Sequence, residues 1–130
     1  MRHILLITLF AVSSLSWADD FKCNPNGNQA ELNACANESF ARADKELNRV
    51  YQALLQKEVK NKTFINKLRT AQKAWIVFRD AELEAMFACD DEPNICWGSM
   101  YPMSFLYAKE ELTLQRTKKL QQILENGRGQ

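Results

Sequence analysis

The sequence has very little of what enzymes use for nucleophilic or metal-assisted chemistry. Its one histidine is His3, which lies in a segment that we expect to be removed. Without histidine the remaining chain has no Ser–His or Cys–His nucleophile and lacks the usual zinc ligands. Its few glycines, at positions 27, 98, 127 and 129, form no phosphate-binding loop. We therefore expect no enzyme, no metal and no cofactor.

An excess of basic charge is also absent. The chain has 17 Lys and Arg residues, of which Arg2 falls in the removed segment, against 16 Asp and Glu residues. A protein that binds nucleic acid needs a basic face to neutralise phosphates. The even balance therefore argues against nucleic acid as a partner.

No apolar run is long enough for a permanent transmembrane helix. Arg2, the run ILLITLFAV and the small residues at Ser16 and Ala18 are typical of a secretory signal peptide covering residues 1–18. A retained membrane anchor is the less favoured alternative, because the run is too short to span a bilayer. No cysteine follows the cleavage point directly, which argues against lipoprotein processing. Residues 19–130 are then one exported domain, periplasmic or secreted.

All four cysteines lie in the exported part, and an even count there indicates two disulfides. Local pairing gives Cys23–Cys35 and Cys89–Cys96, and each closed loop contributes about 2–3 kcal/mol in the chain-entropy model. The rival is Cys35–Cys89, because a helical hairpin would bring these two residues together. The local scheme is favoured, but the spacing alone leaves the connectivity open.

Strand-like alternation is missing, and helical periodicity takes its place. We predict an all-α fold with three main helices in up-down-up order. The predicted helices span residues 28 to about 59, residues 63 to about 89, and about 103 to 125. Asn28 and Glu31 form a capping-box pattern at the first start, Asn61 or Thr63 can cap the second, and Gly127 ends the third.

The second predicted helix carries polar residues on an apolar stripe. Leu68, Ala71, Trp75 and Phe78 have helical spacing, and Gln72 and Arg79 share that stripe. A face that mixes a large aromatic ring with a guanidinium and an amide needs a polar partner. We expect that partner on the first helix.

The first two helices are expected to fold back on each other as a hairpin. Antiparallel helices rise equally per residue, so the sum of facing residue numbers is constant. The facing pairs in that register are Phe40–Leu83, Asp44–Arg79, Asn48–Trp75, Tyr51–Gln72 and Leu55–Leu68. The central expectation is a salt bridge between Asp44 and Arg79 that fixes the register, because a buried charge that loses its partner costs about 3–5 kcal/mol.

A further arginine, Arg116, lies among Leu112, Leu120 and Ile123 on the third helix. Either its stem packs while its head reaches water, or it joins Asp44 or Glu82 in an ionic cluster. These two alternatives stay open. We assign a set of polar and aromatic residues to architecture and not to contact: Asp44, Asn48, Tyr51, Gln72, Trp75, Arg79 and Arg116.

Basic residues are absent between Arg79 and Lys109. This stretch contains six acids and then a run of aromatic and methionine residues. Rings supply buried anchors at an interface, and charges of one sign attract a partner of the opposite sign. The alternative is that the rings cover the end of the hairpin and the acids keep a loop soluble. The predicted contact residues are Asp90, Asp91, Glu92, Trp97 and Tyr101.

Four segments give the chain a resemblance to the LprI-type lysozyme-inhibitor domain family of small exported bacterial proteins. They are CANESFARADKELNRVY, LRTAQKAWIVFRDAE, GSMYPM and LTLQRTKKL, in that order. The resemblance covers most of the exported part and implies a helical fold and inhibition of lysozyme. Family members often have cysteines at the positions of Leu83 and Ala108. Both are missing here, so Cys89 and Cys96 look like a local replacement.

The leading hypothesis is a periplasmic protein that inhibits a cationic lysozyme by occluding its substrate cleft. Lysozymes of animal origin are strongly basic, which places the expected contact in the acidic and aromatic stretch from Asp80 to Tyr107. The alternative is a helical scaffold or adaptor of the envelope with no effect on lysozyme. A third possibility, a carboxylate-dependent hydrolase, needs two acids that face one another in a cleft.

Overall fold

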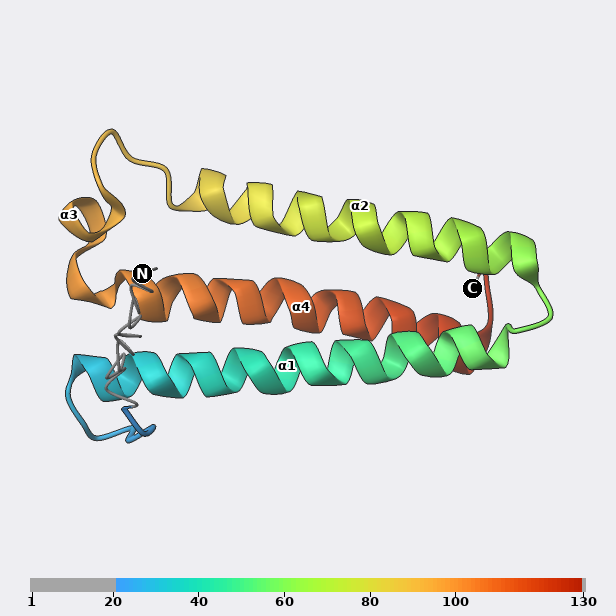
Figure 1. The fold of residues 1–130 in the computed structure, drawn as a ribbon, viewed down its shortest axis with the longest axis horizontal. Helices are drawn as coiled ribbons and strands as arrows, with labels where there is room; N and C mark the ends of the chain where they lie inside the picture. The colour runs from blue at the N-terminus through green and yellow to red at the C-terminus, as the bar shows by residue number, and fades with distance from the viewer. Residues whose placement is uncertain (1–20, 130) are drawn as a thin grey trace, which may run out of the picture.

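Three long helices lie side by side in the computed structural model, which describes residues 21–129 (Figure 1). They are α1 (Gln29–Lys57), α2 (Lys62–Met86) and α4 (Tyr101–Asn126). A one-turn helix α3 (Pro93–Trp97) and a 3-10 turn η1 (Gly98–Met100) connect α2 to α4 at one end. α1 and α4 run in one direction and α2 in the other, so the all-α, up-down-up prediction is confirmed. The predicted signal peptide, residues 1–18, lies outside the described residues.

Local capping signals set where the long helices begin and end. The Asn28 side chain accepts hydrogen bonds from the backbone N–H groups of Ala30 and Glu31, and the Glu31 carboxylate accepts from the Asn28 N–H at 2.8 Å. This is the predicted capping box, which satisfies N–H groups that have no partner within the helix. Asn61 caps α2 by accepting from the Phe64 N–H. Gly127 ends α4 with a positive φ of 83°, a conformation that glycine adopts without strain.

Two predicted boundaries near the α2–α4 connection are wrong by a few residues. α2 ends at Met86 and not near Cys89, because Phe87 leaves the helical conformation. α4 starts at Tyr101 and not at Met103, and it includes Pro102 in its first turn. Proline is tolerated there because the first N–H groups of a helix lack intrahelical partners. Pro93 begins α3 for the same reason.

The closest packing in the molecule is between α1 and α4. Small side chains meet at this contact: Ala36 and Ala43 of α1 and Thr113 and Thr117 of α4 are all buried. The two threonine hydroxyls donate to the carbonyls one turn earlier, of Lys109 and Thr113, so they need no partner across the contact. Small side chains allow two helix axes to approach closely. Beyond them, toward the α1–α2 turn, the core contains Leu47, Val50, Leu54, Leu68 and Leu120.

The predicted hairpin of α1 and α2 is only partly correct. α2 contributes Ile65, Leu68 and Leu83 to the buried residues, yet α4 and not α2 is the closest neighbour of α1. Phe40, expected to meet Leu83, lies beneath the Lys109 ammonium of α4 at 4.9 Å. Small residues on α1 favour the close approach of α4, whereas α2 presents bulky side chains toward the bundle.

The salt bridge expected between Asp44 and Arg79 is not formed. Arg79 is buried at 7% exposure, but its guanidinium pairs with the adjacent Asp80 at 2.8 Å. The Asp44 carboxylate instead accepts a hydrogen bond from Asn48, one turn along α1. Asp80 is adjacent to Arg79 in the sequence, so it is available as a partner before any tertiary contact forms. The prediction that an Asp44–Arg79 salt bridge fixes the register of α1 and α2 is therefore wrong.

Both disulfides follow the local scheme. Cys23 bonds to Cys35, which joins the N-terminal segment to α1, and Cys89 bonds to Cys96, which closes the loop between α2 and α3. The rival pairing Cys35–Cys89 is therefore excluded. Among residues 21–129, no helix is both long and apolar enough to cross a membrane.

The α1–α4 contact generates a prediction about overpacking. Ala43 is 4% exposed on the face of α1 that is buried, whereas Ala41 is exposed on the same helix. We expect Ala43→Leu to lower the free energy of unfolding by about 1–3 kcal/mol, since extra methylenes must force the helices apart. Ala41→Leu, the matched control, should change it by less than about 0.5 kcal/mol. Urea denaturation followed by circular dichroism measures both, and equal effects of the two substitutions would refute the close-packing argument.

Candidate interaction site

The polar residues of α2 form a cluster with Arg116 of α4. The Arg116 Nε donates to the Gln72 side-chain oxygen at 2.9 Å. The Trp75 ring lies next to two guanidinium groups, with the Arg79 Cζ 5.1 Å and the Arg116 Cζ 5.9 Å from its centroid. A guanidinium within about 6 Å of an indole is attracted by the negative face of the ring. Gln72 and Trp75 thus contact the Arg116 guanidinium, and Trp75 also contacts that of Arg79. Neither arginine pairs with Asp44, the carboxylate considered for both.

Of the two alternatives for Arg116, the ionic cluster is wrong, and the packed stem with its head reaching water is partly correct. The guanidinium is only half-buried, and its hydrogen-bond partner is a neutral amide, so the ionic cluster with Asp44 or Glu82 is absent. Partial burial lowers the pKa of Arg116, and the interaction with the nearby Tyr51 phenol acts in the opposite direction. Arginine remains protonated at neutral pH in any case. The charge is kept at the edge of the helix bundle by a ring and an amide.

The remaining architectural residues line a groove between α1 and α2. Asn48 and Tyr51 lie on one side and Gln72 on the other of a hollow of about 430 Å³. The expected proximity of Tyr51 and Gln72 is therefore seen, although no hydrogen bond joins them. Asn48 donates to the backbone carbonyl and the carboxylate of Asp44, at 2.9 and 3.2 Å. This side of the bundle is polar and carries no predicted contact residue.

Aromatic rings gather at the end of the bundle where α2, α3 and α4 meet. Phe87 is the centre, with ring centroids of Trp97, Tyr101 and Phe105 at 5.5, 5.7 and 5.6 Å. Trp97 and Tyr101 present their edges to Phe87 at interplanar angles of 70° and 77°. Edge-to-face pairs contribute about 0.5–1.5 kcal/mol beyond the area that they bury. This cluster closes the end of the molecule, as the alternative interpretation of the rings predicted.

Trp97 is nevertheless not buried by its neighbours. Its indole N–H donates to the Phe87 carbonyl at 3.2 Å, which fixes the orientation of the ring, but 46% of the residue stays exposed. Ile95 and Met100, close to it in the chain, are 68% and 53% exposed. The rings therefore have two roles: Phe87 and Phe105 cover the end of the bundle, while Trp97 presents a fixed apolar surface to solvent.

The three predicted acids lie beside these rings on the connection between α2 and α3. Asp90, Asp91 and Glu92 are all exposed, and none of them forms an ion pair with any residue in the range 21–129. Asp91 accepts a hydrogen bond from the Glu92 N–H at 2.8 Å, which holds the local turn. The Cys89–Cys96 disulfide encloses all three. We call these acids together with Phe87, Trp97, Tyr101 and Phe105 the acidic–aromatic end.

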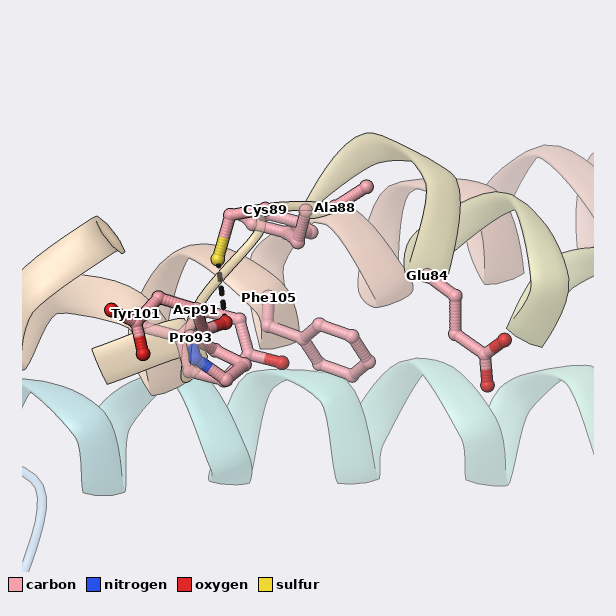
Figure 2. Close-up of a pocket in the computed structure, with 8 residues that line it drawn as sticks. Glu84, Ala88, Cys89, Asp91, Pro93, Tyr101 and Phe105 are labelled. Atoms are coloured by element: carbon pink, nitrogen blue, oxygen red, sulfur yellow. Dashed lines mark hydrogen bonds between the residues drawn. The ribbon is translucent and has the colours of Figure 1, made fainter. Parts of the chain in front are cut away.

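A shallow cavity of about 240 Å³ lies at the acidic–aromatic end. Figure 2 shows its lining, in which the Phe105 ring lies between Glu84 on one side and Asp91 with Tyr101 on the other. The Cys89 sulfur approaches the Asp91 carbonyl to 3.0 Å. A disulfide sulfur has no proton to donate, so this is a close contact only. The cavity combines carboxylates with aromatic walls, a combination that suits a cationic group.

Sequence reasoning did not single out Phe87, the centre of the ring cluster. It follows Leu83 at the helical spacing of four and directly precedes Ala88 and Cys89. Its position near the end of a helix could therefore be inferred from the sequence. Its role was missed because only the rings after Cys96 were considered. Within the part of the chain that the structure describes, no group of three His, Cys, Asp or Glu side chains could hold a metal ion.

A family model described as "Lysozyme inhibitor LprI" matches residues 22–120. The chain belongs to the LprI family. The matched range contains all three long helices apart from the last turns of α4, both disulfides and the acidic–aromatic end. The chain is also similar to an uncharacterized protein of Rhizobium meliloti (strain 1021). The two are 34% identical over 116 residues, which cover 80% of this chain and 79% of the relative. No solved structure matches the chain significantly.

The position of Trp75 between two guanidiniums in this LprI-family chain can be tested by substitution. We expect Trp75→Leu to lower the free energy of unfolding by about 1–2 kcal/mol more than Trp75→Phe, because phenylalanine keeps an aromatic face and leucine does not. Thermal and urea denaturation of the two variants provide the comparison. If both unfold at the same urea concentration, the contacts of Arg79 and Arg116 with the ring add nothing to stability.

Proposed function

We propose that this LprI-family protein is an exported, periplasmic inhibitor of lysozyme, that it is not itself an enzyme, and that it binds through the acidic–aromatic end. The family description supports a protein partner of the lysozyme class. The observation that carries the choice of surface is the group of three exposed acids, Asp90, Asp91 and Glu92, beside the half-exposed Trp97. Contact at this end would occlude the substrate cleft of the enzyme and leave the helices as a scaffold.

The charge distribution favours a cationic partner. None of the three acids has a basic neighbour in the sequence closer than Arg79 or Lys109. Carboxylates held near one another without a counter-charge create a negative potential, and such a potential speeds association with a protein of opposite charge. A basic lysozyme meets that condition, and nucleic acid does not. We infer the same preference for the cavity beside them, where Glu84 and Asp91 flank the Phe105 ring.

The rigidity of the loop supports binding in preference to a purely structural role. The Cys89–Cys96 disulfide, the one-turn helix α3 and the Trp97 hydrogen bond to Phe87 all restrict the segment that carries the acids. Ordering a loop upon association costs free energy, and a loop that is already ordered avoids much of that cost. The disulfide stabilises the fold in any case, and a preordered binding surface is a further gain from the same restriction.

A carboxylate-dependent hydrolase is the less favoured interpretation. Glu84 and Asp91 line the same cavity, but in Figure 2 the Phe105 ring lies between them. General acid and base catalysis requires two carboxyl groups with an open path to one substrate bond. The absence of histidine after His3 removes the other common proton carriers and nucleophile activators.

Lysozyme turnover is the direct test of the proposed inhibition. We expect purified protein to reduce lysis of cell walls by a basic lysozyme at micromolar concentration, and less strongly at high salt because screening weakens the attraction. The triple variant Asp90→Lys, Asp91→Lys, Glu92→Lys should lose most of this effect. The matched control reverses the same number of charges at the exposed acids Glu46, Glu111 and Glu125, and should keep it.

Two outcomes would contradict the proposal in different ways. If neither animal nor bacterial lysozymes are inhibited at micromolar protein, the function is wrong and the envelope scaffold or adaptor becomes preferred. If inhibition occurs but the two triple variants behave alike, the function stands and the assigned surface is wrong. The observation that favours a scaffold as the second candidate is the exposure of large apolar side chains on α2, Val77 at 70% and Phe78 at 59%.

Trp97 provides a separate test of the anchor. We expect Trp97→Ala to weaken inhibition by about thirtyfold or more, because buried tryptophans at interfaces commonly contribute at least about 2 kcal/mol. Tyr107→Ala is the control, since Tyr107 has nearly the same exposure, 44% against 46%, but lies outside the ring cluster. The midpoints of inhibition curves give the comparison, and thermal melts show whether both variants fold. Equal loss in the two variants would exclude Trp97 as the anchor.

A further inference from the structure

α2 has two faces, and only one of them has a partner in the described structure. Its buried residues recur every three or four positions and face α1 and α4: Ile65, Leu68, Gln72, Arg79 and Leu83. The residues on the opposite side of a helix are those about half a turn away. On α2 they are Thr70, Ala74, Val77, Ala81 and Ala85, with Phe78 at the edge, and every one of them is exposed. In Figure 1 α2 lies at the outside of the bundle.

This outer face of α2, defined by the six residues above, is apolar apart from Thr70, whereas a solvent-facing helix is usually charged. Val77 is 70% exposed and Phe78 is 59% exposed, although both are large apolar side chains. Alanines precede and follow them at helical spacing. Nothing on this face is needed for the contacts with α1 or α4, so its composition has no explanation within one copy of the chain.

The charged residues beside the outer face are separated by sign along the helix. Lys67 and Lys73 lie in the N-terminal half of α2, and Asp80 and Glu84 lie in the C-terminal half. All four are exposed. The arrangement is self-complementary only for two helices that run in opposite directions, since parallel helices would place lysine against lysine.

We propose that the outer face of α2 binds the same face of a second copy, with the two α2 helices antiparallel around a two-fold axis near Ile76. Equal rise per residue then sets which positions face each other. Ala74 meets the second copy's Val77, and Thr70 meets the second copy's Ala81. Lys73 faces the second copy's Asp80 on the flank, and Lys67 faces the second copy's Glu84. Symmetry repeats each of these pairs.

The details of the face fit this occupant better than others. Alanine at the centre lets two helices approach closely, and the pairing buries Val77 and Phe78, which are otherwise exposed. An anionic membrane surface would attract Lys67 and Lys73 but repel Asp80 and Glu84, so it matches only half of the charges beside this face. None of the residues that define the acidic–aromatic end takes part in the contact, although Glu84 also lines the cavity beside it. A measurement of mass therefore tests the dimer separately from the proposed inhibition. The two copies would present their acidic–aromatic ends in opposite directions.

The experiment is a measurement of mass against concentration by analytical ultracentrifugation. The wild-type chain should show a reversible monomer–dimer equilibrium in the micromolar range, since the interface of a single helix pair is small. Lys67→Glu and Glu84→Lys should each weaken dimerisation about tenfold or more, because two opposite-charge pairs become two like-charge pairs. Lys118→Glu, at an exposed position of α4, is the matched control and should leave it unchanged.

Mixing the two charge variants gives the decisive result. Lys67→Glu alone places acid against acid, and Glu84→Lys alone places base against base, but a mixed dimer restores opposite charges at both pairs. We expect dimers to reappear in the equimolar mixture. Val77→Glu adds a variant at a position so exposed that folding is not at risk, and it should be monomeric. A wild-type chain that stays monomeric throughout, or a dimer that survives all three substitutions, would overturn the proposal.

Discussion

The close packing of α1 against α4 is the constraint on which the rest of the structure depends. It is possible because Ala36 and Ala43 present almost no side chain and because Thr113 and Thr117 satisfy their hydroxyls within their own helix. α2 cannot approach as closely, since it carries the indole of Trp75 and the guanidinium of Arg79 on its inner face. It therefore packs at the side of the α1–α4 pair, where the Trp75 ring lies next to the Arg79 and Arg116 guanidiniums and Gln72 accepts a hydrogen bond from Arg116.

Local signals made much of this fold predictable from the sequence. The capping box at Asn28, the cap at Asn61 and the terminating Gly127 act over four residues or fewer, so no tertiary information is needed to recognise them. The two disulfides follow the local scheme that the sequence favoured, although the spacing alone left the connectivity open. What the sequence did not show is which helix pair is closest. In two antiparallel helices the residue numbers of facing residues have a constant sum. This rule gives the register of such a pair, but it says nothing about the distance between the two helices.

The salt bridge predicted for Asp44 and Arg79 shows a second limit. Helical spacing placed each residue on the correct helix at a compatible height, but a competing partner was adjacent in both cases. Asp80 is bonded to Arg79 directly along the chain, and Asn48 lies one turn from Asp44. Such local partners cost little entropy to engage, so they prevail unless a tertiary contact is much stronger. Phe87 was missed for the opposite reason: its partners Trp97, Tyr101 and Phe105 come from later segments whose arrangement no local pattern reveals.

The arrangement of charge around Phe87 links the fold to the proposed interaction. The chain places Asp90, Asp91 and Glu92 within one disulfide loop and gives them no basic neighbour. Like charges confined in this way repel one another and raise the free energy of the unbound protein. The rings beneath them and the disulfide around them must offset that repulsion. A cationic partner that contacts these acids and Trp97 would relieve the repulsion and bury the exposed ring in one step, so part of the driving force for association is already stored in the free protein as unpaired charge.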